Sequence, residues 1–593
     1  MDYDLHQLTC DFITIAKSKE EKTNYRYIIS WHGRLAQSLF LVFFIALIFS
    51  PSVPAQVEGQ EPLGPPASTG LPLPSADSRP ETMQLPLERV FVRKIVVTGS
   101  TVFSEDELAE VIAPYANREL TSEDLEELRR ALTIYYIERG YVNSGAIIPD
   151  QTIKDGLVRF HIIEGKLTNI ELEGNKWFRS SYIQNRLALG VEPPLNISPL
   201  QKRLQLLQQD KRIQRLNAEL RPGVKPGESV LKVGVKEKMP YKTSVVFDNY
   251  QSPSVGAENI KLNIAPQNLT GNGDILDLTV GGSEGLKPLL EARYSIPITA
   301  YDTTMALRYK HTQYEVVERP FDDLDIESDT DYYTIGLDHP FYRSLNHKFT
   351  MGLVGEHIRN KTYLLGEPFS FSPGAENGKY NQTALRFIQE YTYRSQRQAI
   401  AARSRFTLGI DALDATTSDD SSVPDSEFFA WLGQFQWAGI WGDLGIETIF
   451  RTDIQLVNDS LLAVELISTG GRYSVRGYRE STFVRDNAVI AQFETRLPLF
   501  RNRWWADYIQ LVPFVDYGRG WNEDLPTSGR KTIYSAGIGL RWRATWEISP
   551  TEKLRPRFEI YWGHDFKDVD YPSDEDDLQD DGIHLQFAIS AGI

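Results

Sequence analysis

An alternation of apolar and polar side chains with a period of two residues constrains this chain most, and it runs through residues 241–593. Leu290 and Ala292, for example, alternate with Glu291 and Arg293. Successive side chains of a β-strand point to opposite faces of the sheet, so each such segment has one apolar and one polar face. More than half of the chain is therefore predicted to be all-β.

Sixteen segments carry the alternation, and they begin near residues 242, 257, 274, 288, 302, 330, 346, 383, 401, 428, 442, 488, 508, 534, 555 and 583. They span about ten residues each, which suits a tilted strand that crosses a bilayer better than the five or six residues usual in a soluble β-sandwich. Short connections follow several even-numbered segments, whereas the long acidic ones follow odd-numbered segments and lie at 315–331, 411–427 and 565–581. Long external loops and short periplasmic turns are typical of outer-membrane barrels, so we predict a transmembrane barrel of about sixteen antiparallel strands.

The N-terminal residues are predicted to be an export signal. No apolar run reaches the roughly 18 to 20 residues that a membrane-spanning helix needs, which excludes a helical membrane protein. The longest run, residues 39–49, follows Arg34 and leads into small residues that end at Ala55. This pattern predicts a signal peptide over residues 1–55, cleaved after Ala55, with an uncleaved anchor as the alternative. The polar stretch at residues 1–33 is longer than usual, which suggests that translation starts further along.

Cysteine usage and charge agree with an exported protein. The only cysteine, Cys10, lies in the predicted signal, so the mature protein has no thiol to oxidise outside the cytoplasm. The net charge is −17, and residues 1–55 hold five basic and five acidic side chains, so the negative excess belongs to the exported part. So acidic a chain is not expected to bind nucleic acid.

Two repeats of one pattern precede the predicted barrel. Residues 56–88 are rich in proline and are predicted to be a linker. Residues 89–165 and 166–238 then each show the order β-α-α-β-β, and Ser104 with Glu107 marks one helix start as a capping box. The expected elements are strand 90–97, helices 104–113 and 122–139, and strands 142–149 and 157–164 in the first repeat, and strand 167–173, helices 180–189 and 198–213, and strands 218–222 and 230–237 in the second.

The sequence contains no recognisable catalytic, cofactor-binding or metal-binding motif. A nucleophile elbow, an HExxH motif, a Walker loop and a Cys/His cluster are all absent. The nine histidines are scattered, and we interpret them as surface or lumen residues. The acidic runs Asp419-Asp420 and 574–581 lack the glycine spacing of an EF-hand loop, so we interpret them as solvated loops.

Two short motifs stand out in the predicted barrel. The first motif lies in the longest connection, from about Ile454 to Asn487. The second motif lies on the predicted strand that begins near residue 508, and its alternate residues face the lumen. A carboxylate inside a barrel needs a cation, and an arginine on a glycine-flanked loop can supply two hydrogen bonds to it. Taken alone, the motifs fit equally well an exposed loop arginine and an ordinary strand aspartate. The motif residues are Val475, Arg476, Gly477 and Tyr478 in the loop and Phe514, Asp516 and Gly518 in the strand.

With both motifs at these strand counts, the chain resembles the outer-membrane transporters of two-partner secretion, the TpsB type or ShlB/FhaC/HecB haemolysin secretion/activation family. The two repeats look like POTRA domains. Residues 475–478 match the family's VRGY/F motif at the tip of the sixth external loop, and residues 514–518 match its FxDxG motif on strand thirteen. The resemblance covers residues 89–593, and it implies that the loop folds into the barrel and that Arg476 pairs with Asp516.

The resemblance also implies a function. The chain is expected to be an outer-membrane pore, with no enzymatic activity and no cofactor, whose POTRA domains lie in the periplasm. They would recognise an unfolded secreted exoprotein, large and β-helical, and the barrel would translocate it to the cell surface by type V, two-partner secretion. Outer-membrane lipid and, during biogenesis, the barrel-assembly machinery are the other expected partners. The family often plugs its pore with an N-terminal helix, but residues 56–88 are too proline-rich to predict one.

Alternatives to export remain at this point. An assembly factor of the same superfamily, which inserts other barrels, shares both motifs but usually carries more POTRA domains. A passive porin would not need the repeats, and a secreted enzyme would need a catalytic constellation. The predicted lumen face carries charges of both signs, which suits a sliding chain; these are Lys261, Arg293, Arg308, Lys310, Arg386, Arg403, Arg405, Arg451, Arg496 and Arg541 against Asp277, Glu291, Glu390, Glu447, Glu494 and Asp516.

Overall fold

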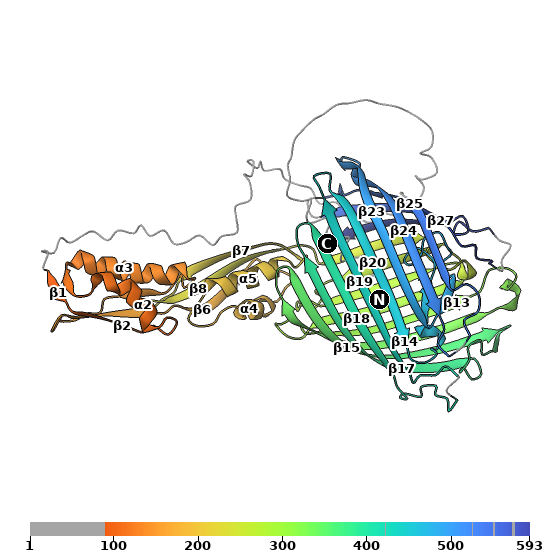
Figure 1. Ribbon diagram of the computed structural model, residues 1–593, viewed down its shortest axis with the longest axis horizontal. Coiled ribbons are helices and arrows are strands. Elements are labelled where there is room, and N and C mark those ends of the chain that lie inside the picture. The colour runs from red at the N-terminus through yellow and green to blue at the C-terminus, as the bar shows by residue number, and fades with distance from the viewer. Residues whose placement is uncertain (1–88, 421–422, 525, 550–551, 572–575, 593) are drawn as a thin grey trace, which may run out of the picture.

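The computed structural model describes residues 89–420, 423–524, 526–549, 552–571 and 576–592. Two small α/β units and a barrel follow one another along its long axis (Figure 1). The expected signal peptide at 1–55 and the expected linker at 56–88, with the question of a plug helix, lie outside the described residues. Within the described ranges, no helix is both long and apolar enough to cross a membrane.

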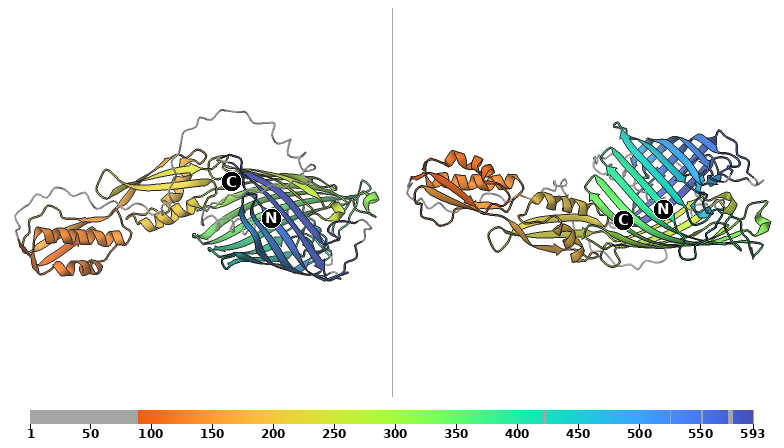
Figure 2. Two further views of the ribbon diagram at one scale, coloured as in Figure 1. Left: turned by 90° about the horizontal axis from the view of Figure 1, so that it is seen from above. Right: turned by 60° about the horizontal axis from the view of Figure 1, so that its bottom comes forward.

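The first unit packs its helices against one side of its strands (Figure 2). Its central strands β2 and β5 run parallel, and β4 pairs antiparallel with β5. Both helices begin with capping boxes, and the Ser104 backbone N–H and hydroxyl lower the pKa of the Glu107 carboxyl. The elements are β1 (Val90–Val92), β2 (Lys94–Thr98), α2 (Glu105–Ile112), the 3-10 turn η3 (Ala113–Tyr115), β3 (Arg118–Leu120), α3 (Ser122–Glu138), β4 (Gly145–Ile147) and β5 (Leu157–Ile163).

The predicted single strand at 90–97 is wrong, because the chain forms two strands there. The Arg93 backbone N–H donates to the carbonyl of Gly156 at 2.8 Å, and the chain changes partner at this point. Strand β1 pairs with β3, which the sequence did not predict, while β2 joins the main sheet. The strand predicted at 142–149 is also shorter than expected and is limited to β4.

The second unit repeats the order and has a separate core. Its strands are ordered β6-β8-β7, and the buried side chains of α4 and α5 pack against this sheet. The helix predicted at 198–213 ends at Gln208, because Asp210 accepts the Arg212 backbone N–H in a tight turn and Ile213 pairs with Glu237 in the sheet. The elements are β6 (Lys166–Glu173), α4 (Ser180–Ala188), α5 (Ile197–Gln208), β7 (Ile213–Pro222) and β8 (Glu228–Glu237).

Sixteen long antiparallel strands close into a barrel, with the last strand hydrogen-bonded to the first. They are β9 (Tyr241–Asp248), β10 (Asn259–Pro266), β11 (Ile275–Gly282), β12 (Leu286–Pro297), β13 (Thr304–Glu315), β14 (Glu327–Arg343), β15 (His347–Leu364), β17 (Lys379–Arg394), β18 (Gln398–Gly409), β19 (Phe429–Trp441), β20 (Ile446–Val457), β23 (Asn487–Arg503), β24 (Ala506–Trp521), β25 (Thr532–Arg543), β27 (Lys553–Asp565) and β28 (Ile583–Gly592). Two short strands, β16 (Glu367–Pro368) and β26 (Trp546–Glu547), add to the ring. The predicted fold class is confirmed, and each strand begins within four residues of its predicted start.

The alternation sorts the side chains of the barrel as predicted. On β24, Val515 is 57% exposed on the outer face while its neighbour Asp516 is 1% exposed inside. The largest differences in strand position are four residues, at β17 and β20. Strand β20 begins at Ile446 rather than near 442, because Gly442 and Gly445 adopt positive φ in a tight turn. The barrel wall therefore has an apolar outside and a charged inside, as a membrane barrel requires.

The second unit rests on two turns of the barrel. Arg186 of α4 forms an ion pair with Asp302 in the turn between β12 and β13, with 2.7 Å between Nη2 and Oδ1. The Arg212 guanidinium donates to the carbonyl of Gly273 at 2.9 Å, and the Arg179 backbone N–H donates to the carbonyl of Gly271. These turns follow β10 and β12, the second and fourth strands of the barrel. Turns after even-numbered barrel strands are periplasmic, so both units lie at the periplasmic end of the barrel.

Candidate functional site: a loop held inside the barrel

The connection between β20 and β23, residues 458–486, folds into the barrel instead of extending outward. It contains a short hairpin of β21 (Ile467–Thr469) and β22 (Phe483–Arg485). Arg476 at its tip is 1% exposed, and Val475 and Tyr478 are likewise buried. Polar backbone and charged side chains inside a barrel need partners, so the contacts of this loop define the site.

Arg476 and Asp516 form a bidentate ion pair. Arg476 Nε donates to Asp516 Oδ2 at 2.7 Å, and Nη2 donates to Oδ1 at 2.8 Å. The Arg476 backbone N–H also donates to Oδ2, at 3.0 Å. The pairing that the family resemblance implied is thus present, with a third hydrogen bond that fixes the loop backbone as well as its side chain.

The pair belongs to a larger group that we call the lumen arginine cluster. Glu494 accepts from Arg476 Nη1 at 2.6 Å and also pairs with Arg496, while Glu559 accepts from Arg541 and pairs with Arg472 of the loop. All of these side chains are buried. Each buried arginine faces at least one buried carboxylate, and such pairing is what makes buried ions tolerable. The cluster consists of Arg472, Arg476, Arg496 and Arg541 with Glu447, Glu494, Asp516 and Glu559.

Aromatic rings of the wall complete the setting of the two loop arginines. The Arg476 guanidinium carbon lies 3.8 Å from the ring centre of Phe514, and that of Arg472 lies 3.9 Å from the ring centre of Tyr561. Stacking on an aromatic face adds a cation–π attraction to the ion pairs. The Phe of the strand motif therefore contributes directly to holding the loop.

Each motif glycine makes room for a close contact. Gly477 has φ of +90°, and a Cβ there would lie 2.8 Å from the carbonyl atoms of Gly563 on β27. A Cβ at Gly518 would lie 2.5 Å from Thr469 Cγ2 and 2.8 Å from Val475 Cγ2. A larger residue at either position would push the loop off the wall.

Val475 and Tyr478 give the loop an apolar anchor. They form one buried cluster with Phe483 and Ile533. The Tyr478 hydroxyl donates to the Tyr534 carbonyl at 3.1 Å. The seven predicted site residues are thus brought together by one loop and its facing strands.

Sequence reasoning missed a second attachment of the same loop. The Glu465 carboxylate accepts a hydrogen bond from Arg386 Nη1 of β17 at 3.1 Å. The Gln382 side-chain amide donates a second hydrogen bond to Glu465 at 2.7 Å. Glu356 of β15 pairs with the same arginine. Strands β17 and β27 are the eighth and fifteenth of sixteen, so Glu465 and Arg472 reach nearly opposite walls and the loop crosses the lumen. The position of Arg386 on the lumen face was the only available signal.

A third attachment joins the loop to two others. Arg479 pairs with Glu318, in the connection between β13 and β14, and with Asp580, in the connection between β27 and β28. Its guanidinium lies 4.4 Å from the ring centre of Tyr571. Asp580 is exposed, as expected for a solvated loop residue, but it also accepts hydrogen bonds from the buried Arg479, a contact that the sequence did not predict.

The barrel has sixteen long strands, a charged loop bound across its lumen, and two α/β units at its periplasmic end. These features together define an outer-membrane transporter with POTRA-type units. The model of the haemolysin secretion/activation protein ShlB/FhaC/HecB family matches residues 227–542, and that of the POTRA domain, ShlB-type, matches residues 90–165. The chain belongs to the ShlB/FhaC/HecB family, and it is an outer-membrane transporter that translocates an exoprotein.

Known proteins of similar sequence and structure agree with this assignment. The outer membrane transporter CdiB of Dickeya dadantii (strain 3937) is 22% identical over 493 residues, which cover 78% of this chain and 84% of that protein. The hemolysin transporter protein ShlB of Serratia marcescens is 24% identical over 481 residues, covering 78% and 82%. The solved structure of CdiB from Escherichia coli has a TM-score of 0.60 at 21% identity and covers 87% of this chain and 93% of that one, which supports the fold.

Proposed function

We propose that residues 89–165 and 166–238 act as two POTRA domains that receive an unfolded exoprotein in the periplasm, and that residues 241–593 form its pore. Strand β7, ten residues long, lies at the edge of the second sheet. An edge strand offers unpaired backbone groups to an extended chain, so it suits a partner that has not folded. The attachment of this unit to the barrel turns keeps such a partner next to the pore.

The partner in this proposal is a large, β-helical secreted protein, and no reaction is catalysed during its transit. Folding at the cell surface would make transit irreversible. Outer-membrane lipid surrounds the apolar wall, and the barrel-assembly machinery inserts the chain during biogenesis. The relatives named hemolysin transporter and CdiB support the class of partner but do not identify it.

We further propose that the loop at 458–486 is the gate of the pore. The lumen arginine cluster, the Glu465 attachment and the Arg479 attachment hold this loop across the lumen at rest. An exoprotein that enters the barrel must displace the loop or part of it. The main support for the proposal is the bidentate ion pair between Arg476 and Asp516, together with the hydrogen bond from the Arg476 backbone N–H to Asp516.

A Glu465→Gln substitution should open the resting pore. The amide keeps the size of the side chain but removes the charge that holds Arg386, while Glu356 remains to pair with that arginine. A charge-assisted hydrogen bond contributes about 1.5 to 3 kcal/mol, so the open state should gain tenfold or more. Single-channel recording of the purified chain in planar bilayers measures the open fraction.

Glu427→Gln is the matched control, since this glutamate is exposed in the connection between β18 and β19. Its open fraction should equal that of the unaltered chain. Equal open fractions for Glu465→Gln and the control would show that Glu465 does not hold the gate.

Epitope tags test the orientation of the chain in the membrane. Tags inserted at Asp420 or Asp576 should be reached by antibody on intact cells. These connections follow β18 and β27, the ninth and fifteenth long strands of the barrel, and connections after odd-numbered barrel strands are external. A tag at Asp443, in the tight turn between β19 and β20, should be reached only after permeabilisation. The turn near Gly271 is a poorer site for the hidden tag, because it contacts the second unit. The reverse labelling pattern would contradict the orientation.

A further inference from the structure

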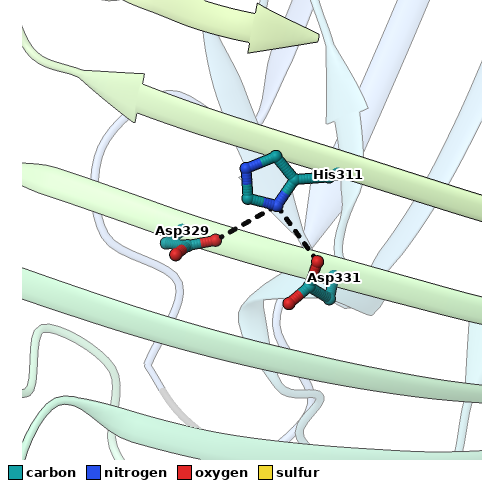
Figure 3. A group of neighbouring side chains, drawn as sticks. All are labelled: His311, Asp329 and Asp331. Carbon is teal, nitrogen blue, oxygen red and sulfur yellow. Dashed lines mark hydrogen bonds and ion pairs between the residues drawn. The ribbon is translucent and has the colours of Figure 1, made fainter. Parts of the chain in front are cut away.

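A side-chain cluster outside the lumen has no role in the proposed gate. His311 of β13 stands directly opposite Asp331 of β14 in the ladder, and Asp329 lies two residues further along the same face (Figure 3). Their ligand atoms lie within 4.8 Å of one another, and this is the single group of its kind in the described ranges. This cluster was not predicted from the sequence, because the spacing between His311 and the two aspartates matches no metal-binding motif.

The cluster faces outward at the external end of the two strands. Thr312 and Thr330, next in the chain to His311 and Asp331, are buried toward the lumen, whereas Tyr309 and Tyr333 are exposed on the outer face. Because side chains alternate, His311, Asp329 and Asp331 share the face of these tyrosines. Aromatic side chains mark the edges of the apolar band of a barrel, so the cluster lies just beyond this edge at the height of the lipid headgroups.

The geometry of the three groups suits one metal ion. His311 Nδ1 lies 3.0 Å from Asp331 Oδ1 and 3.5 Å from Asp329 Oδ1. Ligands bonded to one tetrahedral ion at about 2.0 to 2.2 Å lie roughly 3.3 to 3.6 Å apart, so the His311–Asp329 separation already suits an ion and the His311–Asp331 separation needs to widen slightly. The ladder between β13 and β14 fixes the backbone of all three residues, so little reorganisation is needed to bind.

The two carboxylates differ in their other partners. Asp331 Oδ1 also accepts the Tyr309 hydroxyl at 2.8 Å, whereas Asp329 has no partner but His311 among the described residues. Asp329 Oδ1 is shielded from solvent and accepts no hydrogen bond from any described residue. Arg359 and Lys361 of β15 stand opposite Asp331 and Asp329 in register. The Arg359 guanidinium turns instead toward His357, at 3.2 Å, and within the described ranges neither cation lies within ion-pair distance of either aspartate. A shielded carboxylate oxygen turned toward an imidazole nitrogen is a binding position for a cation.

We propose that His311, Asp329 and Asp331 form a site for a divalent first-row transition metal such as Zn²⁺. One imidazole nitrogen with two carboxylate oxygens favours such an ion over Mg²⁺ or Ca²⁺, which prefer oxygen ligands alone. Three protein ligands leave a coordination position open on the outer side. Binding would fasten β13 to β14 at the base of the connection that carries Glu318, one of the partners of Arg479.

Zinc titration of the full chain, purified without a histidine tag in detergent, tests the site. Calorimetry should give one Zn²⁺ per chain, and His311→Gln and Asp329→Asn should each weaken binding at least tenfold. His347→Gln is the matched control, because this histidine lies on β15 against the Tyr391 hydroxyl, and it should bind Zn²⁺ as the unaltered chain does. The heat-dependent shift of a folded barrel on a gel shows that each variant is folded.

Cobalt gives a second readout that reports the ligands of the bound ion. Co²⁺ bound to a nitrogen and two carboxylates should give visible absorption bands that His311→Gln abolishes and His347→Gln retains. The proposal is overturned if the unaltered chain binds no Zn²⁺, if His311→Gln binds it equally well, or if Mg²⁺ and Ca²⁺ compete at equal concentration.

Discussion

Replacing either Arg476 or Asp516 by alanine should reduce export of the partner protein at least tenfold while the barrel still inserts. Arg476→Ala leaves Asp516 buried without a cation, which costs about 3 to 5 kcal/mol. Asp516→Ala leaves Arg476 with Glu494 as its remaining partner and removes all three hydrogen bonds that hold the loop to β24. The loop should then leave its position on the wall, whereas the sixteen-strand ladder does not depend on it. Secreted partner in the medium, normalised to folded barrel in the outer membrane, measures the effect.

Two further variants make this test specific. Arg519→Ala, an exposed arginine on the same strand β24, should export normally. The double variant Arg476→Ala with Asp516→Ala keeps the charge balance of the lumen arginine cluster, so its loss should be smaller than the sum of the single losses. Unchanged export in both single variants would reject the role of the pair.

Deleting residues 89–164 should abolish secretion of one large partner and leave the amounts of other outer-membrane barrels normal. The first unit has its own buried core, separate from that of the second unit, so the remaining unit and barrel should fold. An assembly factor of the same superfamily would give the reverse result, a general loss of barrels with no single secreted protein missing. Quantitative proteomics of the outer membrane and of the medium distinguishes the two outcomes.

The isolated fragment 89–238 provides the binding counterpart of this deletion. With two complete cores it should fold alone and bind the N-terminal region of the unfolded partner, but not the folded partner. Micromolar affinity or weaker is expected, because ordering a disordered chain offsets part of the contact energy. Equal binding of folded and unfolded partner would contradict recognition through an edge strand.

The order of elements and the orientation of side chains were predictable from local pattern. Both capping boxes lie within four residues of sequence, so Ser104 with Glu107 marked a helix start before any tertiary contact was known. The breaks at Arg93 and at Asp210 were not predictable, because there a hydrogen bond to a distant or turn residue overrides the local strand or helix preference. The pairing of Arg476 with Asp516 came from resemblance to a family, since its residues alone fit an ordinary surface arginine equally well.

The sequence by itself determined the sixteen strands, their inner and outer faces and the two repeats, because a period of two or 3.6 residues is a local property that burial enforces everywhere along the chain. Only the tertiary structure decided which charges meet. The path of one loop pairs Glu465 with Arg386 and Arg479 with Glu318 and Asp580. The register of two strands places His311 beside Asp331. Such contacts join residues from 20 to more than 150 positions apart, and no local period specifies how a loop crosses a lumen.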